Sequence, residues 1–547
     1  MKLKETSTEQ KLKGAYYTPL QLADIMIGYY SDYSFERVLE PSCGDGVFLD
    51  SLYKANMLSD VEKLVAIEIE KDEANKVAQK YESFQNVEIL QKDFFDFYKE
   101  TTSEDKYDLI VGNPPYIRYQ YLSEKQKNIQ AQILTSHGMK SNKLINAWVA
   151  FLVACVQLLT QNGKILFVIP AEILQVAYAE DLRLYLSNNL SKITLITFDQ
   201  LVFPDIKQEV VVLIGEKTTE EKGIRIIATE DLESLKDVNL SEYSFREIQH
   251  VKEKWTKYFI NAEEMRLIQS IKDSDQFVQF SEYGVINVGI TTGNNKYFSV
   301  DKNIEEKYDL GNVTIPLIGR GSHAHGIYFT HDDWQLNVES GKRAMLVNFP
   351  DIPFEKYPKS HKDYISYGEA HDEHTGYKCS IRDRWYIVPS VWVPDTFFLR
   401  RNNLYPKFVL NRCGAVSTDT MHRMKFYDQV DPNDVLLSYY NSISFAFTEI
   451  CGRSYGGGVL EILPGEMRRI QLPVVKNVDP QLKRELLSYV DTIVRNDENI
   501  ELALDRVDKE LLQNELGIDR NVCITCRMIW KKLQRRRLER GNLCPKG

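Results

Sequence analysis

Short apolar runs alternate with stretches of helical spacing along residues 1 to about 220. The runs are rich in Val, Ile and Leu and are short enough to be strands. Near-continuous apolar strands separated by helices are typical of a parallel sheet that helices cover on both faces. We therefore predict an α/β fold with a mostly parallel sheet, with helices at 72–81 and 144–159 and strands at 37–39, 63–68, 87–90, 107–111, 164–169 and 209–214.

This rhythm is lost after a charge-rich stretch at 216–257, which we interpret as a linker. Predicted strands at 258–470 are short and irregular, and Gly, Asn, Pro and aromatic residues lie among them, which predicts an α+β domain. Helical spacing returns at 477–517, where Ile500, Leu504, Val507 and Leu511 form one apolar stripe. The predicted parts are an α/β domain at 1–240, an α+β domain at 241–475 and a helical C-terminal segment at 476–547.

Composition is that of a globular protein of several domains, since the chain has 547 residues and 43% of them are hydrophobic. No apolar run reaches the roughly 18 residues that a membrane helix needs. The longest run, 147–159, predicts a buried helix. A polar N-terminus and sparse cysteines favour a cytoplasmic protein with no membrane partner. Cys523 and Cys526 have only Cys544 nearby, so we predict free thiols and no metal site.

The net charge of −10 argues against a nucleic-acid partner when taken alone, but the charge is unevenly distributed. Residues 381–430 hold eight Lys or Arg against four acids, with aromatic residues among them. Basic and aromatic side chains together fit contact with phosphates and with a groove of DNA. An ordinary solvated surface over a small core explains this stretch equally well. The basic tail at 527–547 is interpreted either as an arm on the DNA backbone or as a disordered end.

A Gly-rich turn follows the first predicted strand. It contains Glu40, Pro41, Ser42, Cys43, Gly44, Asp45 and Gly46. The carboxyl ends of parallel strands bind cofactors, and glycines let a ligand approach the backbone closely. Acids in this turn would repel a pyrophosphate and suit a ligand with an ammonium group and ribose hydroxyls, such as S-adenosylmethionine. An ordinary tight turn is the alternative.

Acidic residues also end the next two predicted strands. Glu68 is placed to accept hydrogen bonds from a ribose diol. Asp93 is placed to accept from the amino group of an adenine ring, with Phe94 packing on that ring. A lone acid after a strand is more often a helix cap, so this second assignment depends on its place in the series of strands.

The most specific motif directly follows the fourth predicted strand and reads Asn113, Pro114, Pro115 and Tyr116. Two consecutive prolines fix the backbone and remove two amide hydrogens, so carbonyl groups there act as pure acceptors. The Asn113 side-chain oxygen and the Pro114 carbonyl could both accept from one exocyclic amino group and expose its lone pair for attack on a methyl group. Tyr116 offers a face for stacking a flat base.

The quartet and the acidic Gly-rich turn resemble the amino-group DNA methyltransferases. A segment at 14–19 resembles a third motif of that family, which helps to hold the methionine part of the cofactor. The order of the motifs resembles the gamma subgroup, which includes the TaqI and Eco57I type adenine-N6 methylases of type II restriction-modification systems. The resemblance implies a Rossmann-like catalytic domain that uses S-adenosylmethionine, followed by a target-recognition domain.

The resemblance also assigns roles to residues of this chain. Asn113, Pro114, Pro115 and Tyr116 would be catalytic, and Tyr116 and Phe203 would stack on a flipped adenine. The implied cofactor-binding set is Tyr16, Tyr17, Thr18, Pro19, Glu40, Pro41, Ser42, Cys43, Gly44, Asp45, Gly46, Glu68, Ile69, Asp93, Phe94 and Asn113. More loosely, the segments 289–296, 318–321 and 451–458 resemble parts of the specificity domains attached to such enzymes.

The expected reaction is methyl transfer to N6 of a flipped adenine in double-stranded DNA. We expect a monomer whose partner endonuclease is encoded separately. Alternatives are methylation of cytosine N4, of RNA or of a protein glutamine, because these enzymes carry the same or a related quartet. A non-catalytic DNA specificity subunit is a further alternative.

Overall fold

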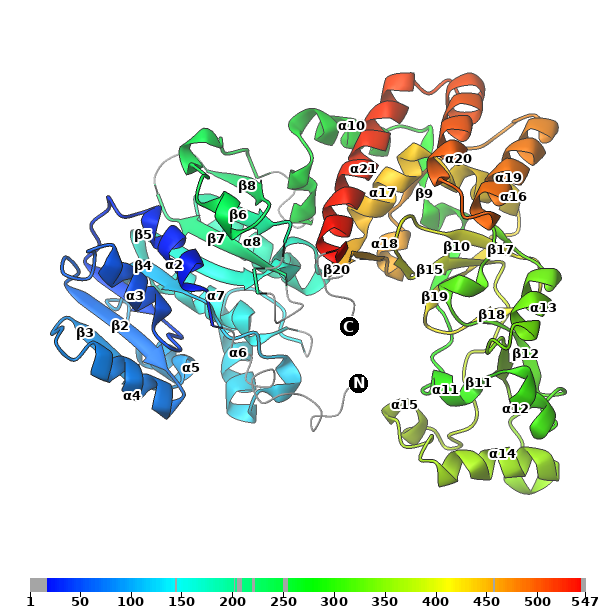
Figure 1. Cartoon of the computed structure of the whole chain (residues 1–547), viewed down its shortest axis with the longest axis horizontal. Helices are drawn as coiled ribbons and strands as arrows, with labels where there is room; N and C mark the ends of the chain where they lie inside the picture. Colours follow the sequence, from blue (N-terminus) through cyan, green and yellow to red (C-terminus); the bar gives the residue numbers. More distant parts are fainter. Residues whose placement is uncertain are drawn as a thin grey trace. The chain divides into compact units, whose positions relative to one another are not determined.

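The computed structural model describes residues 17–142, 145–200, 202–203, 209–218, 222–248, 254–455 and 458–542. The chain divides into two compact units (Figure 1). Unit 1 reaches Phe259, and unit 2 spans Ile260–Asn542.

Unit 1 is built on an eight-stranded sheet in the order β3-β2-β1-β4-β5-β7-β6-β8. Strands β1 to β5 pair in parallel, and β7 runs antiparallel to both β5 and β6. The predicted α/β fold with a mostly parallel sheet is confirmed. The strands are β1 Arg37–Glu40, β2 Lys63–Glu68, β3 Val87–Gln91, β4 Tyr107–Gly112, β5 Leu159–Pro170, β6 Lys192–Phe198, β7 Val210–Glu216 and β8 Gly223–Thr229.

Two features of this sheet differ from the sequence prediction. Strand β6 was not predicted, and β8 lies inside the stretch interpreted as a linker. In β8 the residues alternate between apolar and polar types only in part, and its stability comes from parallel pairing with β6 over its whole length. Cross-strand pairing of this kind joins residues about 30 positions apart, which a local pattern does not reveal.

Helices of unit 1 pack on the sheet. Leu22 of α2 and Phe48 of α3 share one core with inward residues of the strands, among them Leu64, Leu109 and Val212. Helix α7 is buried along nearly its whole length, as its continuous apolar run predicts. The helices are α2 Leu20–Gly28, α3 Val47–Lys54, α4 Lys71–Lys80, α5 Phe94–Glu100, α6 Glu124–Ser136, α7 Ala147–Leu158, α8 Glu180–Asn189 and α9 Leu232–Leu235.

The described residues of unit 2 form four small sheets. Their orders are β10-β19-β15-β17-β13, β11-β14-β12-β18, β16-β21-β20 and β22-β9. The strands are β9 Phe277–Gln279, β10 Gly284–Val288, β11 Ser299–Val300, β12 Thr314–Ile318, β13 Tyr328–Phe329, β14 Met345–Val347, β15 Thr396–Leu399, β16 Arg401–Asn402, β17 Phe408–Asn411, β18 Val416–Ser417, β19 Met421–Phe426, β20 Arg453–Tyr455, β21 Val459–Glu461 and β22 Gln471–Pro473.

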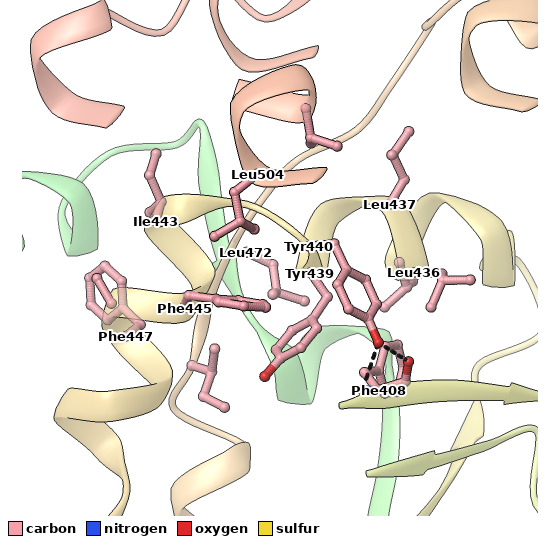
Figure 2. Close-up of a cluster of buried hydrophobic side chains, with 14 of the residues drawn as sticks. Phe408, Leu436, Leu437, Tyr439, Tyr440, Ile443, Phe445, Phe447, Leu472 and Leu504 are labelled. Atoms are coloured by element: carbon pink, nitrogen blue, oxygen red, sulfur yellow. Dashed lines mark hydrogen bonds between the residues drawn. The ribbon is translucent and has the colours of Figure 1, made fainter. Parts of the chain in front are cut away.

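Helices of unit 2 surround a large apolar core. Figure 2 shows Tyr439, Tyr440 and Phe445 at its centre, where the Tyr440 hydroxyl donates to the Phe408 carbonyl at 2.8 Å. The helices are α10 Ala262–Lys272, α11 Asn295–Phe298, α12 Lys302–Lys307, α13 His331–Glu339, α14 Lys359–Ala370, α15 Tyr377–Ser380, α16 Pro432–Tyr439, α17 Ser442–Cys451, α18 Pro464–Met467, α19 Pro480–Arg495, α20 Ile500–Val507 and α21 Arg520–Asn542.

The C-terminal residues are part of this core. Ile500, Leu504, Val507 and Leu511 are all buried in it, as their spacing predicts. Helix α21 packs along α17, so residues 476–542 lie within unit 2. Residues 527–542 form a packed helix and not a disordered end, and contact of this segment with the DNA backbone stays a prediction. Cys523 and Cys526 are buried in the same core, and Cys544 lies outside the described residues.

No helix among the described residues is both long and apolar enough to cross a membrane.

Candidate active site

Three strand ends meet at one edge of the sheet in unit 1. Glu40 ends β1, Glu68 ends β2 and Gly112 ends β4. Strand β1 lies between the other two, and both neighbours pair with it in parallel. The carboxyl ends of these strands therefore bring the Gly-rich turn, Glu68 and the Asn113 segment together, as the α/β prediction requires.

The Gly-rich turn has a shape that requires glycine. Gly44 and Gly46 have φ angles of +52° and +83°, a region that other residues rarely adopt. The Cys43 amide donates to the Ile67 carbonyl at 2.8 Å, which ties the turn to the end of β2. A Cβ on Gly46 would lie 3.2 Å from the Val77 methyl groups, so the start of α3 is packed closely against α4.

Glu68 organises this turn. One of its carboxylate oxygens accepts from the Gly44 amide at 2.9 Å, and the other accepts from the Glu70 amide at 2.7 Å. A carboxylate oxygen has two acceptor sites, so each oxygen keeps capacity for one more donor. This geometry can bind a diol while it holds the turn in place.

Glu40 lies in an unusual environment for a carboxylate. It is 1% exposed, and its Oε2 atom has no hydrogen-bond partner among the described residues. Burial, and then the charges of Asp45, Glu68 and Asp50, raise the pKa of Glu40 well above its ordinary value. Burial also raises the pKa of Asp45. A cluster of acids that is costly to ionise together favours a ligand that carries positive charge.

Tyr17 lies against the Gly-rich turn. A Cβ on Gly44 would be 3.5 Å from Cε1 of the Tyr17 ring, which remains half exposed. Burial and nearby Glu73, Asp45 and Glu68 raise its pKa. Thr18 is buried, and Pro19 caps α2. The structure thus brings Tyr17 to the turn, whereas Tyr16 lies outside the described residues.

The Asn113 segment is held from two sides. The Ser42 hydroxyl donates to the Asn113 carbonyl at 3.3 Å, and Pro41 packs against Gly112. At the other end, the Tyr116 hydroxyl donates to the Val168 carbonyl of β5 at 3.1 Å. The next residue, Ile117, accepts from the first amide of α7 at 2.9 Å. Such support lets a short acceptor-rich segment keep one shape.

Asp93 caps α5 in this structure. Its carboxylate accepts from the Phe95 amide at 2.8 Å and from the Gln126 side chain at 2.9 Å. Phe94 is buried, and its ring stacks on Phe151 with centroids 4.6 Å apart. The structure therefore shows the helix-cap role that the sequence left open, and the contact of both residues with adenine stays a prediction. Ile69, beside Glu68, is 52% exposed.

Gln126 is a site neighbour that the sequence interpretation missed. The signal was present, because Ser123 and Gln126 form a capping box at the start of α6. The spacing identifies the cap but does not show that Gln126 also reaches Asp93, which lies 33 residues earlier.

Phe203 is 6% exposed and belongs to the core that also contains Phe198 and Val212. Tyr116 is partly buried against the same core. The two aromatic residues that were predicted to stack on a base therefore lie around one cluster. In this conformation the Phe203 ring is covered, and its stacking on a base stays a prediction.

Most basic groups of 381–430 are engaged within unit 2. Arg384 pairs with Asp351, Lys425 pairs with Asp395 at 2.6 Å, and Arg400 and Arg401 share Glu461. The Arg423 guanidinium lies 4.2 Å from the ring of Trp392. The local excess of positive charge is therefore smaller than the sequence indicates, because two of these acids lie outside the stretch.

The segments at 289–296 and 451–458 use many side chains for internal support. A Cβ on Gly289 would lie 1.9 Å from the Thr418 carbonyl, and Asn294 binds Glu373. Arg453 pairs with Glu466 at 2.6 Å. Arg320, in the segment 318–321, is exposed and forms no ion pair within the part of the chain that the structure describes.

Comparison with known proteins follows the same division of the chain. The family described as Eco57I restriction-modification methylase matches residues 46–203. The family described as type II methyltransferase M.Eco57I, C-terminal domain, matches residues 252–512. The type II methyltransferase M.AccI of Acinetobacter calcoaceticus is 25% identical over 93% of this chain and 95% of its own. M.HindII of Haemophilus influenzae is 26% identical over 64% of this chain and 67% of its own.

Two solved structures share the fold. The type IIL restriction-modification enzyme MmeI, solved in complex with DNA, has a TM-score of 0.56 at 13% identity, over 97% of this chain and 80% of its own. A DrdV–DNA complex has a TM-score of 0.52 at 12% identity, over 88% of this chain and 58% of its own. Since the two family matches fall in both units and M.AccI aligns along nearly its whole length, the chain belongs to the type II restriction-modification methylases of the Eco57I type and is a DNA methyltransferase.

Proposed function

We propose that the protein transfers a methyl group from S-adenosylmethionine to N6 of a flipped-out adenine in double-stranded DNA, as a gamma-subgroup methylase. The observation that carries this proposal is the Asn113–Tyr116 segment, held at the end of β4 beside an acidic Gly-rich turn. The segment offers hydrogen-bond acceptors for an amino group, and the turn beside it offers a site for a cationic cofactor.

The chain's residues fit the cofactor. S-adenosylmethionine supplies a methyl group on a positively charged sulfonium. Glu68 would accept hydrogen bonds from the ribose hydroxyls while its bonds to the Gly44 and Glu70 amides hold the turn. Glu40 and Asp45 would favour the positive charge of the ligand. Tyr17, Thr18 and Pro19 would flank the methionine part, and Ile69, Asp93 and Phe94 would lie toward the adenine.

The amine acceptors act on the target base. The Asn113 side-chain oxygen and the Pro114 carbonyl would accept hydrogen bonds from the two N–H groups of the amine and turn its lone pair toward the methyl group. Holding the two reactants in this orientation supplies the catalysis, and no covalent intermediate is needed. Stacking on Tyr116 and Phe203 would return roughly 1–3 kcal/mol per ring of the cost of flipping.

Unit 2 would read the DNA sequence in this proposal. The match of 252–512 to the C-terminal domain of M.Eco57I supports that role. The enzyme would act as a monomer, which sedimentation tests, and would protect DNA from an endonuclease encoded separately. Cytosine N4, RNA and protein glutamine stay as alternative targets, because the quartet suits any planar amino group.

Asn113→Ala tests the assignment of the active site. We expect methyl transfer to plasmid DNA to be lost, since one of the two amine acceptors is removed, while calorimetry shows S-adenosylmethionine bound with nearly unchanged affinity. Asn188→Ala, at an exposed position of α8, is the matched control and should keep full activity. Retained activity in Asn113→Ala would contradict the assignment.

Sequencing of the methylated plasmid identifies the modified base and its sequence context. Methyl groups on cytosine N4, or their appearance on RNA or protein but not on DNA, would replace adenine as the target. Cofactor binding without transfer to any of these acceptors would favour the non-catalytic specificity subunit.

A further inference from the structure

A half-buried polar cluster lies next to the Asn113–Tyr116 segment in unit 1 and has no role in the site described above. Glu172 lies in a short helical turn at Ala171–Leu174, which follows the end of β5 at Pro170. Its carboxylate accepts a hydrogen bond from the Tyr178 hydroxyl. The Asn146 side-chain amide lies 3.5 Å from the same hydroxyl and donates to it. The sequence interpretation singled out none of these three residues.

Asn146 uses its side chain in an unexpected way. It is the N-cap residue of α7, where an asparagine side chain commonly accepts from an amide of the first helical turn. Here it makes no such bond and is directed to Tyr178 instead. The Asn146 side chain therefore bonds to Tyr178 at the position where it could cap α7. This choice of partner indicates that Asn146 stabilises more than the start of α7.

The cluster connects the two supports of the Asn113–Tyr116 segment. One support is the start of α7, because the Ala147 amide, next to Asn146, donates to the Ile117 carbonyl at 2.9 Å. The other is the end of β5, where the Val168 carbonyl accepts from the Tyr116 hydroxyl four residues before Glu172. Through Tyr178, the residues Asn146 and Glu172 thus fix the start of α7 relative to the end of β5.

The turn that carries Tyr178 is itself held firmly. Arg183 is 2% exposed and donates to the Ile173 carbonyl at 2.9 Å and to the Val176 carbonyl at 3.2 Å. Burial and then the Glu172 carboxylate raise the pKa of Tyr178 above its ordinary value, so its hydroxyl remains a donor at neutral pH. A partly buried chain of donors and acceptors of this kind rigidifies its surroundings.

We propose that Glu172, Tyr178 and Asn146 are positioning residues that hold the Asn113–Tyr116 segment in the geometry needed for methyl transfer. This inference rests on the proposed function, because it assigns a role in the same reaction. The three residues act through the segment and need not touch the base or the cofactor.

Tyr178→Phe tests the inference, since it removes one hydroxyl and keeps the ring. We expect the single-turnover rate of methyl transfer to fall about 10- to 100-fold, the range that a displacement of about 1 Å produces. Dissociation constants for S-adenosylmethionine and for DNA should stay within about twofold of wild type, because the segment acts on the reaction step and not on the binding of either partner.

The matched control is Tyr185→Phe, on α8 in the same unit. The Tyr185 hydroxyl donates to the Val153 carbonyl at 3.1 Å and accepts from Gln157 at 2.6 Å, both on α7 and away from its start. Tyr185→Phe loses a comparable number of hydrogen bonds. Its melting temperature should therefore fall about as much as that of Tyr178→Phe, but its single-turnover rate should not change. A loss of rate that follows the melting temperature in both variants would overturn the inference.

Glu172 gives an independent test that separates geometry from charge. Glu172→Gln keeps an oxygen that accepts from Tyr178 and should retain most of the rate. Glu172→Leu removes it and should match Tyr178→Phe, and the double variant Glu172→Leu/Tyr178→Phe should be no slower than either single variant. Additive losses, or an unimpaired Glu172→Leu, would overturn the inference.

Asn146→Ser is used if Tyr178→Phe does not fold. Serine still caps a helix but is too short to reach Tyr178, so the rate should fall while α7 remains formed. A wild-type rate in this variant would contradict the proposal. If the wild-type protein itself transfers no methyl group to DNA, the proposed function fails first, and that result is distinct from a selective effect of these variants.

Discussion

Two glutamates at neighbouring strand ends differ in their surroundings. Both carboxylate oxygens of Glu68 accept hydrogen bonds from backbone amides. Glu40 is buried, and one of its oxygens has no hydrogen-bond partner among the described residues. Both glutamates end a strand, yet Glu68 shapes the turn, whereas the fold disfavours the charged form of Glu40. A buried carboxylate whose pKa is raised by burial and by neighbouring acids is a common mark of a functional site.

Glu40→Gln should stabilise the protein without cofactor and weaken cofactor binding. The pKa of Glu40 is raised in the folded state, so the protonated form favours folding. Its contribution to stability is therefore complete below the ordinary glutamate pKa and is lost as pH rises through the raised value. The melting temperature of Glu40→Gln should exceed that of wild type increasingly from pH 5 to pH 8.

The same substitution removes a negative charge that favours a cationic ligand. Calorimetry at pH 8 should therefore show weaker binding of S-adenosylmethionine to Glu40→Gln than to wild type. Glu36→Gln is the control, because Glu36 is exposed and lies before the first residue of β1. This substitution should alter neither the melting temperature nor the affinity for S-adenosylmethionine. A melting-temperature difference that does not depend on pH would contradict this account of Glu40.

Helix α21 shows how an element can differ from its local composition. Its sequence is strongly basic, but several of its basic side chains reach acids elsewhere in unit 2. Arg527 pairs with Asp508 at 3.1 Å, Lys531 pairs with Glu501 at 2.6 Å, and Arg537 binds Glu449 at 2.9 Å. The last pair is almost fully buried, and Arg537 also donates to the Gly458 carbonyl at 2.7 Å.

Arg537→Ala should strongly destabilise unit 2, because it leaves the Glu449 carboxylate buried without its partner. Removing one member of a buried ion pair costs about 3–5 kcal/mol. Urea unfolding followed by tryptophan fluorescence measures this loss. Arg535→Ala is the matched control on the same helix, since Arg535 is exposed and has no ion pair within the described residues. Equal effects of both variants would contradict a structural role for Arg537.

At the scale of the whole molecule, an acidic protein that acts on DNA must present unpaired cations to the phosphates. The net charge is −10, and many basic groups of 381–430 and of α21 are already paired. We therefore expect binding to DNA with a modest number of phosphate contacts. The affinity should fall as salt rises, with a slope set by that number.

Arg320→Ala tests which cations contribute. Arg320 is exposed and free of ion pairs within the described part of unit 2, so its loss should reduce the slope of log affinity against log salt by about 0.9. Arg384→Ala removes a cation that is already paired with Asp351 and should leave the slope unchanged. The slopes come from fluorescence anisotropy with labelled duplex at several salt concentrations, and equal slopes for both variants would exclude Arg320 as a phosphate contact.

The parallel sheet and the central residues of the candidate site were predictable from the sequence. Apolar strands, the glycines at 44 and 46 and the quartet at 113–116 are local patterns, and parallel topology brings them to one edge. Strand β8 was not predictable, because its pairing with β6 stabilises it rather than its own pattern. The cluster of Glu172, Tyr178 and Asn146 was also missed, since no spacing relates these residues.

The sequence by itself determined the α/β class, the candidate site residues that follow each strand, and the motifs that resemble those of a methylase. The tertiary structure alone decided which groups are engaged: Asp93 as a helix cap, Phe203 within a core, and Arg537 paired with Glu449 at a distance of 88 residues along the chain. The physical reason is that strand ends and turns depend on neighbouring residues. Burial and charge pairing depend on residues that only folding brings together.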